Sequence, residues 1–95
     1  MLTSKSKSPF VYRSKTDIIV DVIGVIIIKK EKANKTNIQQ AANLNHRQVE
    51  KYLSHIQSMG LIKKEEKNGH MIYHATDVGM TYYNSMLQNR LHNLM

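Results

Sequence analysis

The chain lacks cysteine and tryptophan altogether and has a single proline among its 95 residues. Without a thiol it can form no disulfide, no thiolate zinc site, no iron–sulfur cluster and no cysteine nucleophile. Long hydrophobic runs are also absent, because the longest, residues 18–28, spans eleven positions and is interrupted by Asp21. A membrane-spanning helix needs about 20 apolar residues, and residues 1–9 contain no apolar stretch that would form a secretory signal. We therefore expect a cytoplasmic protein with no membrane partner.

Acidic residues are scarce as well. Seven Asp and Glu stand against fourteen Lys and Arg, which gives a net charge of +7. The positive charge is concentrated in residues 1–15 and 29–35, whereas residues 76–95 are neutral. Such an excess predicts attraction to a polyanion, either nucleic acid or an anionic membrane. The length suits one folded domain and leaves no room for a separate catalytic domain.

Motifs that carry catalysis or bind metal are also missing. There is no glycine-rich phosphate loop and no Gly-x-Ser-x-Gly elbow, and the adjacent Glu65 and Glu66 would face opposite sides of a strand. The five histidines have neither cysteines nor paired carboxylates at ligand spacing. We therefore expect no enzyme, no cofactor and no metal.

The apolar segment at 17–29 is rich in β-branched residues and could form a strand or a helix. On a helical wheel Asp17, Asp21 and Gly24 fall within about 60° of one another. On a strand Asp21 and Gly24 would face opposite sides. One narrow polar stripe predicts a helix, with an apolar face wider than a single neighbour requires.

Two shorter amphipathic helices follow, at 36–42 and at about 46–59. The second opens with Asn45 and Gln48, which match the reciprocal side-chain pair of a capping box. It ends before Gly60, a residue suited to the left-handed position after a helix. Two helices joined by so short a turn predict a helix-turn-helix unit.

A hairpin and a last helix complete the chain. The extended runs in 61–75 are joined by Asn68 and Gly69, which favour the positive φ angles of a tight turn. This hairpin after a helix-turn-helix predicts a wing. The fold class is therefore mainly α (α+β), a winged helix-turn-helix in the order ααα-ββ-α. We divide the chain into a flexible basic arm (1–12), the winged domain (13–76) and a C-terminal dimerisation helix (77–95).

Six short segments form a recognisable set: 13–19 (RSKTDII), 35–38 (KTNI), 42–45 (ANLN), 51–53 (KYL), 59–62 (MGLI) and 76–79 (TDVG). Together they resemble the small archaeal winged-helix proteins, and the similarity covers roughly residues 13–80. That family includes transcriptional regulators and dimeric chromatin-type DNA-binding proteins whose C-terminal helices pair as an antiparallel coiled coil. The resemblance implies the same fold, with DNA as a partner.

The third predicted helix is the expected reading element, because the second helix of a helix-turn-helix enters the major groove with its N-terminal residues at the base edges. Arg47 is the best candidate for a bidentate contact to guanine, and Asn45, if it is not fully used as a cap, or Gln48 could meet adenine. Lys51 is expected at a phosphate. Alternatively Arg47 and Lys51 only solvate an exposed face, with Glu50 paired to one of them.

The wing and the start of the second helix add further candidates. Wing lysines usually contact phosphate or the minor groove, and free N–H groups at a helix start can cradle a phosphate. The candidate DNA-binding residues are Thr36, Asn37, Asn45, His46, Arg47, Gln48, Lys51, Ser54, Lys64, Lys67, Asn68 and His70. The arm cations Lys5, Lys7, Arg13 and Lys15 would add contacts, or would form a solubilising tail.

The last helix carries an apolar stripe at spacings of three and four. We expect it to face one side, to overhang the winged domain and to be buried by the same helix of a second chain. The candidate dimer-interface residues are Tyr83, Met86, Leu87, Leu91 and Leu94. Alternatively, this helix folds back on the first helix of its own chain.

Taken together, these features predict a homodimeric DNA-binding protein, associated with the nucleoid, that regulates transcription. Two alternatives remain. One is a non-specific architectural chromatin protein, and the other is a winged-helix adaptor that binds protein rather than DNA. The net charge of +7 favours the DNA-binding alternatives.

Overall fold

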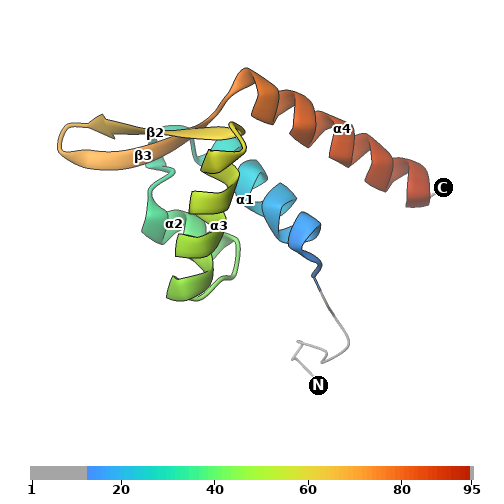
Figure 1. The fold of residues 1–95 in the computed structure, drawn as a ribbon, viewed down its shortest axis with the longest axis horizontal. Coiled ribbons are helices and arrows are strands. Elements are labelled where there is room, and N and C mark those ends of the chain that lie inside the picture. The colour runs from blue at the N-terminus through green and yellow to red at the C-terminus, as the bar shows by residue number, and fades with distance from the viewer. Residues whose placement is uncertain (1–12, 95) are drawn as a thin grey trace.

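A computed structural model describes residues 13–94, with side chains as far as Leu91. The predicted arm at 1–12 and the Leu94 side chain lie outside the described part. The elements in chain order are α1 (Lys15–Lys29), the 3-10 turn η1 (Lys30–Lys32), α2 (Lys35–Ala41), α3 (His46–Ser58), β2 (Ile62–Lys67), β3 (His70–Ala75) and α4 (Asp77–Leu94). The hairpin and α4 project to opposite sides of the three-helix cluster (Figure 1). The predicted winged-helix order is confirmed.

Helix α1 is the central helix of the domain. A capping box starts it, in which the Ser14 hydroxyl accepts from the Asp17 N–H and the Asp17 carboxylate accepts from the Ser14 N–H, both at 3.1 Å. Its apolar residues contact α2, α3, β3 and α4. The wide apolar face predicted from the sequence is therefore used by several neighbours at once.

One aliphatic core joins these elements. Ile23 of α1, Ile38 of α2 and Ile56 of α3 have no solvent-exposed surface, and Ile62 of β2 is 2% exposed. Burying each such side chain stabilises the fold by about 1.5–3 kcal/mol. Because each element supplies a residue to this core, the helix-turn-helix and the hairpin are held in one rigid unit.

The hairpin pairs Ile62 with Ala75 at its base and Lys67 with His70 at its tip. Asn68 and Gly69 have φ angles of 53° and 79°, as a two-residue turn between antiparallel strands requires. The Tyr73 N–H also donates to the Ala33 carbonyl at 3.0 Å. This bond ties the wing to the segment that leads into α2.

Thr76 caps the start of helix α4, because its hydroxyl accepts from the Gly79 N–H at 3.0 Å. The helix then runs beside α1, where the Tyr83 ring lies on Gly24. The predicted single-sided stripe is wrong, because Val78 and Leu91 are about 140° apart on a helical wheel. Both side chains are 62% exposed. No helix in residues 13–94 is long and apolar enough to cross a membrane.

Candidate nucleic-acid interface

The candidate interface is centred on α3. Val49, Leu53 and Ile56 form its buried stripe, so the 3.6-residue period turns the intervening side chains outward. The outward positions include all the residues that the sequence assigned to base or phosphate contact on this helix: Asn45, His46, Arg47, Gln48, Lys51 and Ser54. They form one exposed face that starts at the first turn.

Asn45 and Gln48 are already engaged with the backbone. The Asn45 side chain accepts from the Gln48 N–H at 2.8 Å, and the Gln48 side chain accepts from the Asn45 N–H at 3.0 Å. A bidentate contact to adenine needs both the oxygen and the nitrogen of one amide. In this capping box each side-chain oxygen already accepts one hydrogen bond, so a contact to adenine from Asn45 or Gln48 stays a prediction that requires the amide to be shared with the cap or released from it.

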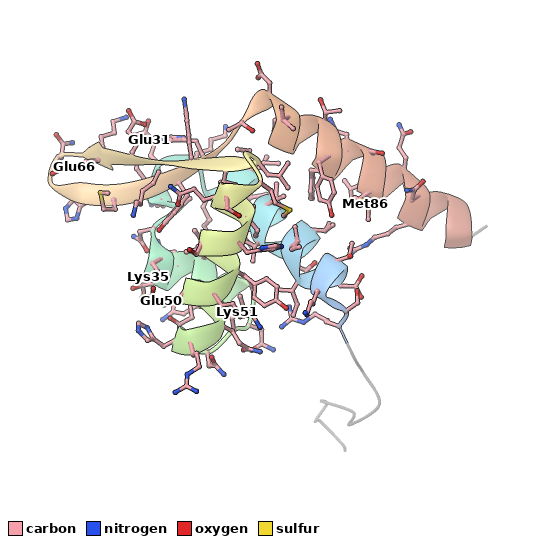
Figure 2. The ribbon with its side chains drawn as sticks, viewed as in Figure 1. Glu31, Lys35, Glu50, Lys51, Glu66 and Met86 are labelled. Atoms are coloured by element: carbon pink, nitrogen blue, oxygen red, sulfur yellow. The ribbon has the colours of Figure 1, made fainter. Side chains whose placement is uncertain are left out.

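Glu50 is paired across the helix-turn-helix rather than along α3. Its carboxylate accepts from Lys35 Nζ, and His46 Nε2 lies 3.6 Å away (Figure 2). The Lys35 hydrogen bond lowers the pKa of Glu50, with smaller contributions from His46 and Lys64. The alternative in which Glu50 pairs with Arg47 or Lys51 is therefore wrong.

Arg47 and Lys51 have no carboxylate within 4.0 Å among residues 13–91. Lys51 Nζ lies 6.0 Å from the centroid of the Tyr52 ring, a distance at which a cation–π contact is weak at an exposed site. Both cations are thus available on the surface of α3.

The start of α2 is less open than its sequence suggested. The Asn37 N–H donates to the Asn34 side chain and the Asn37 side-chain amide donates to the Lys32 carbonyl, both at 2.8 Å. These groups secure the start of a seven-residue helix, so the predicted phosphate cradle does not hold for Asn37. Thr36 is exposed beside it. Lys35, which is not among the predicted contact residues, is the α2 residue that pairs with Glu50 of α3.

The wing cations lie on two different faces. Lys64 is opposite Tyr73 in the register, and its charge contributes to the lowered pKa of Glu50. Lys64 therefore extends the α3 surface. Lys67 faces the other way and lies 2.7 Å from both carboxylate oxygens of Glu31. Its predicted role in DNA contact would require this ion pair to open.

The turn of the wing is exposed. Asn68 and His70 at the hairpin tip are both accessible to solvent, as a groove or backbone contact would require. Neither side chain donates a hydrogen bond within residues 13–91, so both residues stay candidates for DNA contact.

Arg13 is part of the fold and not part of an arm. It donates to the carbonyls of Ala42 at 2.8 Å and Asn43 at 3.0 Å, and to Asp21 at 3.2 Å. These three contacts hold the side chain against α1 and the turn after α2, so Arg13 does not act as one of the arm cations among which the sequence placed it. Lys15 is exposed at the first position of α1, and Lys5 and Lys7 lie outside the described residues.

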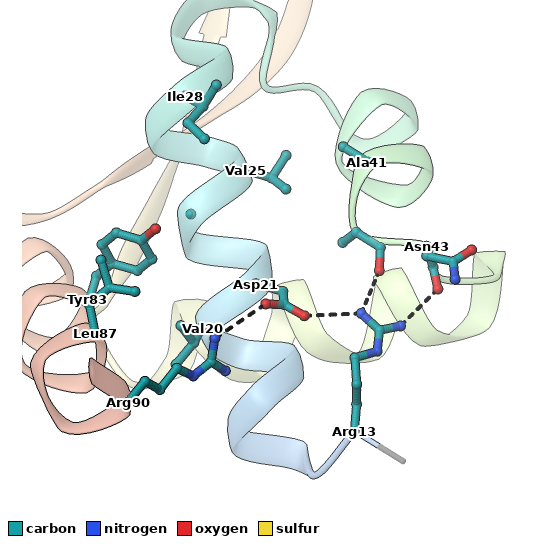
Figure 3. Close-up of a pocket in the computed structure, with 12 residues that line it drawn as sticks. Arg13, Val20, Asp21, Val25, Ile28, Ala41, Asn43, Tyr83, Leu87 and Arg90 are labelled. Carbon is teal, nitrogen blue, oxygen red and sulfur yellow. Dashed lines mark hydrogen bonds and ion pairs between the residues drawn. The ribbon is translucent and has the colours of Figure 1, made fainter. Parts of the chain in front are cut away.

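The candidate dimer residues are divided between an internal contact and the surface. Tyr83, Met86 and Leu87 are half-buried, whereas Leu91 is 62% exposed. The fold-back on α1 that the sequence left open is therefore present in part. Beside this contact α1, α4 and the end of α2 line an open groove of about 280 Å³ (Figure 3). Ile28, on its rim, is 75% exposed.

Metal ligands do not cluster in the described part of the chain. No group of three or more His, Cys, Asp or Glu side chains there has an arrangement that could hold a metal ion. The side chains brought together around α3 are instead cations, amides and hydroxyls.

Comparison with known proteins agrees with this architecture. A family model described as "Winged helix-turn-helix" matches residues 12–94, and the chain belongs to that family. The protein named "Uncharacterized protein MJ0287", from Methanocaldococcus jannaschii, is 31% identical over 85 residues, which is 90% of this chain and 81% of that relative. The crystal structure of Sso10a-2, described as a DNA-binding protein from Sulfolobus solfataricus, is similar with a TM-score of 0.57 and 23% identity. That similarity covers 79% of this chain and 82% of the other.

Proposed function

We propose that this protein binds double-stranded DNA as a homodimer and regulates transcription. In this proposal residues 13–76 form the DNA-binding domain, with α3 in the major groove and the hairpin as a wing, and residues 77–95 form the dimerisation element. The observation that carries the proposal is the α3 surface, where Arg47 and Lys51 are exposed and have no acidic partner among residues 13–91. The solved relative Sso10a-2 is described as DNA-binding, which supports the same use of the fold.

The chemistry of the exposed side chains decides which of them are proposed to contact bases and which to contact phosphates. Arg47 lies on the first turn of α3, where a planar guanidinium can donate two hydrogen bonds to one guanine. Lys51, one turn further along, and Lys64 on the wing would contact phosphates, which fix the register without reading sequence. His46 and Ser54 flank these contacts on the same helix.

Dimerisation is proposed to use α4 together with the groove beside it. Leu91 and Ile28 are exposed large apolar residues, and such surface is costly in water unless a partner covers it. A twofold pair would bury the same patch on both chains. It would also present two copies of α3 to successive turns of a duplex. The protein would then act on the nucleoid in the cytoplasm.

Binding to a generic duplex at rising salt tests the proposal. Each phosphate neutralised contributes a slope of about 0.9 to the plot of log affinity against log salt, so contacts from two subunits should give a steep line. Lys51→Gln should lower the slope, whereas Gln57→Ala, a neutral change on α3, should leave it unchanged. A flat response in the wild type would contradict DNA binding and favour the protein adaptor.

Selection of bound duplexes from a random pool then separates the two DNA-binding alternatives. A regulator should recover a palindrome whose half-sites lie about one helical turn apart. If binding is tight but the selected duplexes share no sequence, the protein does not recognise a specific sequence. That result would favour the architectural chromatin protein.

A further inference from the structure

The Arg13 side chain connects three elements that are distant in sequence. Nη1 donates to the Ala42 carbonyl at 2.8 Å and to Asp21 Oδ2 at 3.2 Å, and Nη2 donates to the Asn43 carbonyl at 3.0 Å. Figure 3 shows the guanidinium between α1 and the end of α2. The guanidinium has five N–H donors in a fixed planar fork and satisfies the three acceptors from two nitrogens, whereas an ammonium donates from a single nitrogen.

The two carbonyls belong to the turn that sets the direction of α3. Ala42 is the C-terminal cap of α2, and Asn43 has a φ of 57°, in the left-handed region. Asn adopts that conformation more readily than other residues with a side chain and often follows the end of a helix, and the Arg13 contacts hold the two carbonyls of this turn in place. Positive charge at the end of a helix also offsets its dipole. Asn45 already caps α3, so only two residues separate the caps of α2 and α3. A shift of the Ala42 or Asn43 backbone would therefore change the direction of α3.

The same network reaches α4 through one carboxylate. Arg90 Nη2 lies 3.1 Å from Asp17 Oδ1, and Arg90 Nη1 lies 3.9 Å from Asp21 Oδ1. Asp21 therefore faces an arginine from each side, with Arg13 on its other oxygen. All four side chains are partly exposed, so each pair alone is weak. Their connection, rather than their individual strength, is what links α4 to the turn.

We propose that Arg13 is a positioning residue for DNA binding and that Asp21 and Arg90 couple it to α4. Arg13 holds the turn so that α3 is presented in one orientation. Arg90 is hydrogen-bonded to Asp17 and lies at ion-pair distance from Asp21, so a displacement of α4 removes a positive charge from beside Asp21 and loosens the Arg13 contacts and the turn. This inference rests on the proposed use of α3 in DNA binding.

DNA affinity and its salt dependence test the positioning role. Arg13→Ala should weaken duplex binding about tenfold, because α3 is no longer held in one orientation, and should leave the salt slope unchanged. Arg13→Lys, which keeps the charge, should recover only part of the affinity. A slope lower by about 0.9 would show that Arg13 contacts a phosphate directly and would overturn the proposal, as would wild-type affinity in Arg13→Ala.

Hydrogen exchange tests the coupling without DNA. The Leu44 N–H donates to the Gln39 carbonyl at 2.9 Å and spans the turn. Arg90→Gln should speed exchange at Leu44 several-fold, and Arg13→Ala combined with Arg90→Gln should add little to Arg13→Ala alone. Arg47→Gln, a matched change outside the network, should have no effect. Unchanged exchange in Arg90→Gln, or fully additive effects, would overturn the coupling. A wild type that binds no DNA would contradict the proposed function, and this measurement would still report on the network.

Discussion

At the scale of single residues, the α3 surface is defined by which cations already have partners. Lys35 is neutralised by Glu50, and Lys67 by Glu31. Arg47 and Lys51 have no such partner within residues 13–91. A count of basic residues therefore overestimates the charge that this face can offer to phosphates, and the acids that hold the other lysines are the residues to change.

Glu50→Gln should strengthen DNA binding. It removes the only acid from the middle of the α3 face and releases Lys35, which raises the number of phosphates that can be neutralised. We expect an affinity several-fold higher and a salt slope steeper by about 0.9, measured by fluorescence anisotropy on a labelled duplex. Asp77→Asn, which removes an equal charge at the start of α4, is the control. Equal gains from both variants would show that only net charge matters.

Acid should destabilise the fold through Glu31. The hydrogen bond from Lys67 lowers the pKa of Glu31 below its ordinary value, so its stabilising contribution is present above that ordinary value and is lost as the pH falls through the lowered one. In urea unfolding, the free energy should decline below about pH 4, and Glu31→Gln should flatten the decline. An identical pH profile in the variant would contradict a role for this pair in stability.

At the scale of elements, local signals were sufficient wherever a few adjacent residues determine the structure. The capping box at Asn45 and the turn at Asn68 and Gly69 were predicted from sequence and are present as expected. These features depend on hydrogen bonds and φ angles within four residues, so they can be predicted from a short stretch of sequence.

Contacts between elements were not predictable in the same way. The pairs Arg13–Asn43 and Lys35–Glu50 join residues that are 30 and 15 positions apart. Their geometry depends on how the helices pack, which no short spacing encodes. The apolar stripe of α4 was misread for a different reason, since Val78 and Leu91 are already about 140° apart on a helical wheel and spacings of three and four drift around a long helix.

Gly79 should not tolerate a side chain. A Cβ atom there would lie 1.9 Å from the Leu61 carbonyl oxygen, which is backbone and cannot rotate away. Gly79→Ala should lower the free energy of unfolding by about 1–3 kcal/mol, the usual cost of overpacking. At Gly24 the added atom would meet the end of the Tyr83 ring at 2.9 Å, so Gly24→Ala should cost less. Urea titration of both variants measures the difference, and the reverse order would contradict this packing.

At the scale of the whole molecule, α4 has two roles in this account. Its contacts with α1 complete the domain, and its second half carries the exposed side chain of Leu91. A domain that left this surface uncovered in solution would be prone to associate, and a second copy can cover it with twofold symmetry.

Leu91→Glu should separate the dimer and leave the domain folded. Leu91 is 62% exposed, so a charge there disturbs little within one chain but opposes burial against a partner. We expect a monomer by light scattering, unchanged helicity and weaker DNA binding. Gln88→Glu adds the same charge at a neighbouring exposed position and should remain dimeric. A monomeric wild type would contradict the dimer directly.

The most direct test of the central claim is a nuclear magnetic resonance titration of the labelled protein with duplex DNA. We expect amide shifts to change at 46–54 of α3 and at 64–70 of the wing, with those at 77–83 of α4 unchanged. Changes confined to α4 and the adjoining groove, with α3 unaffected, would contradict the proposal that this winged helix presents α3 to DNA.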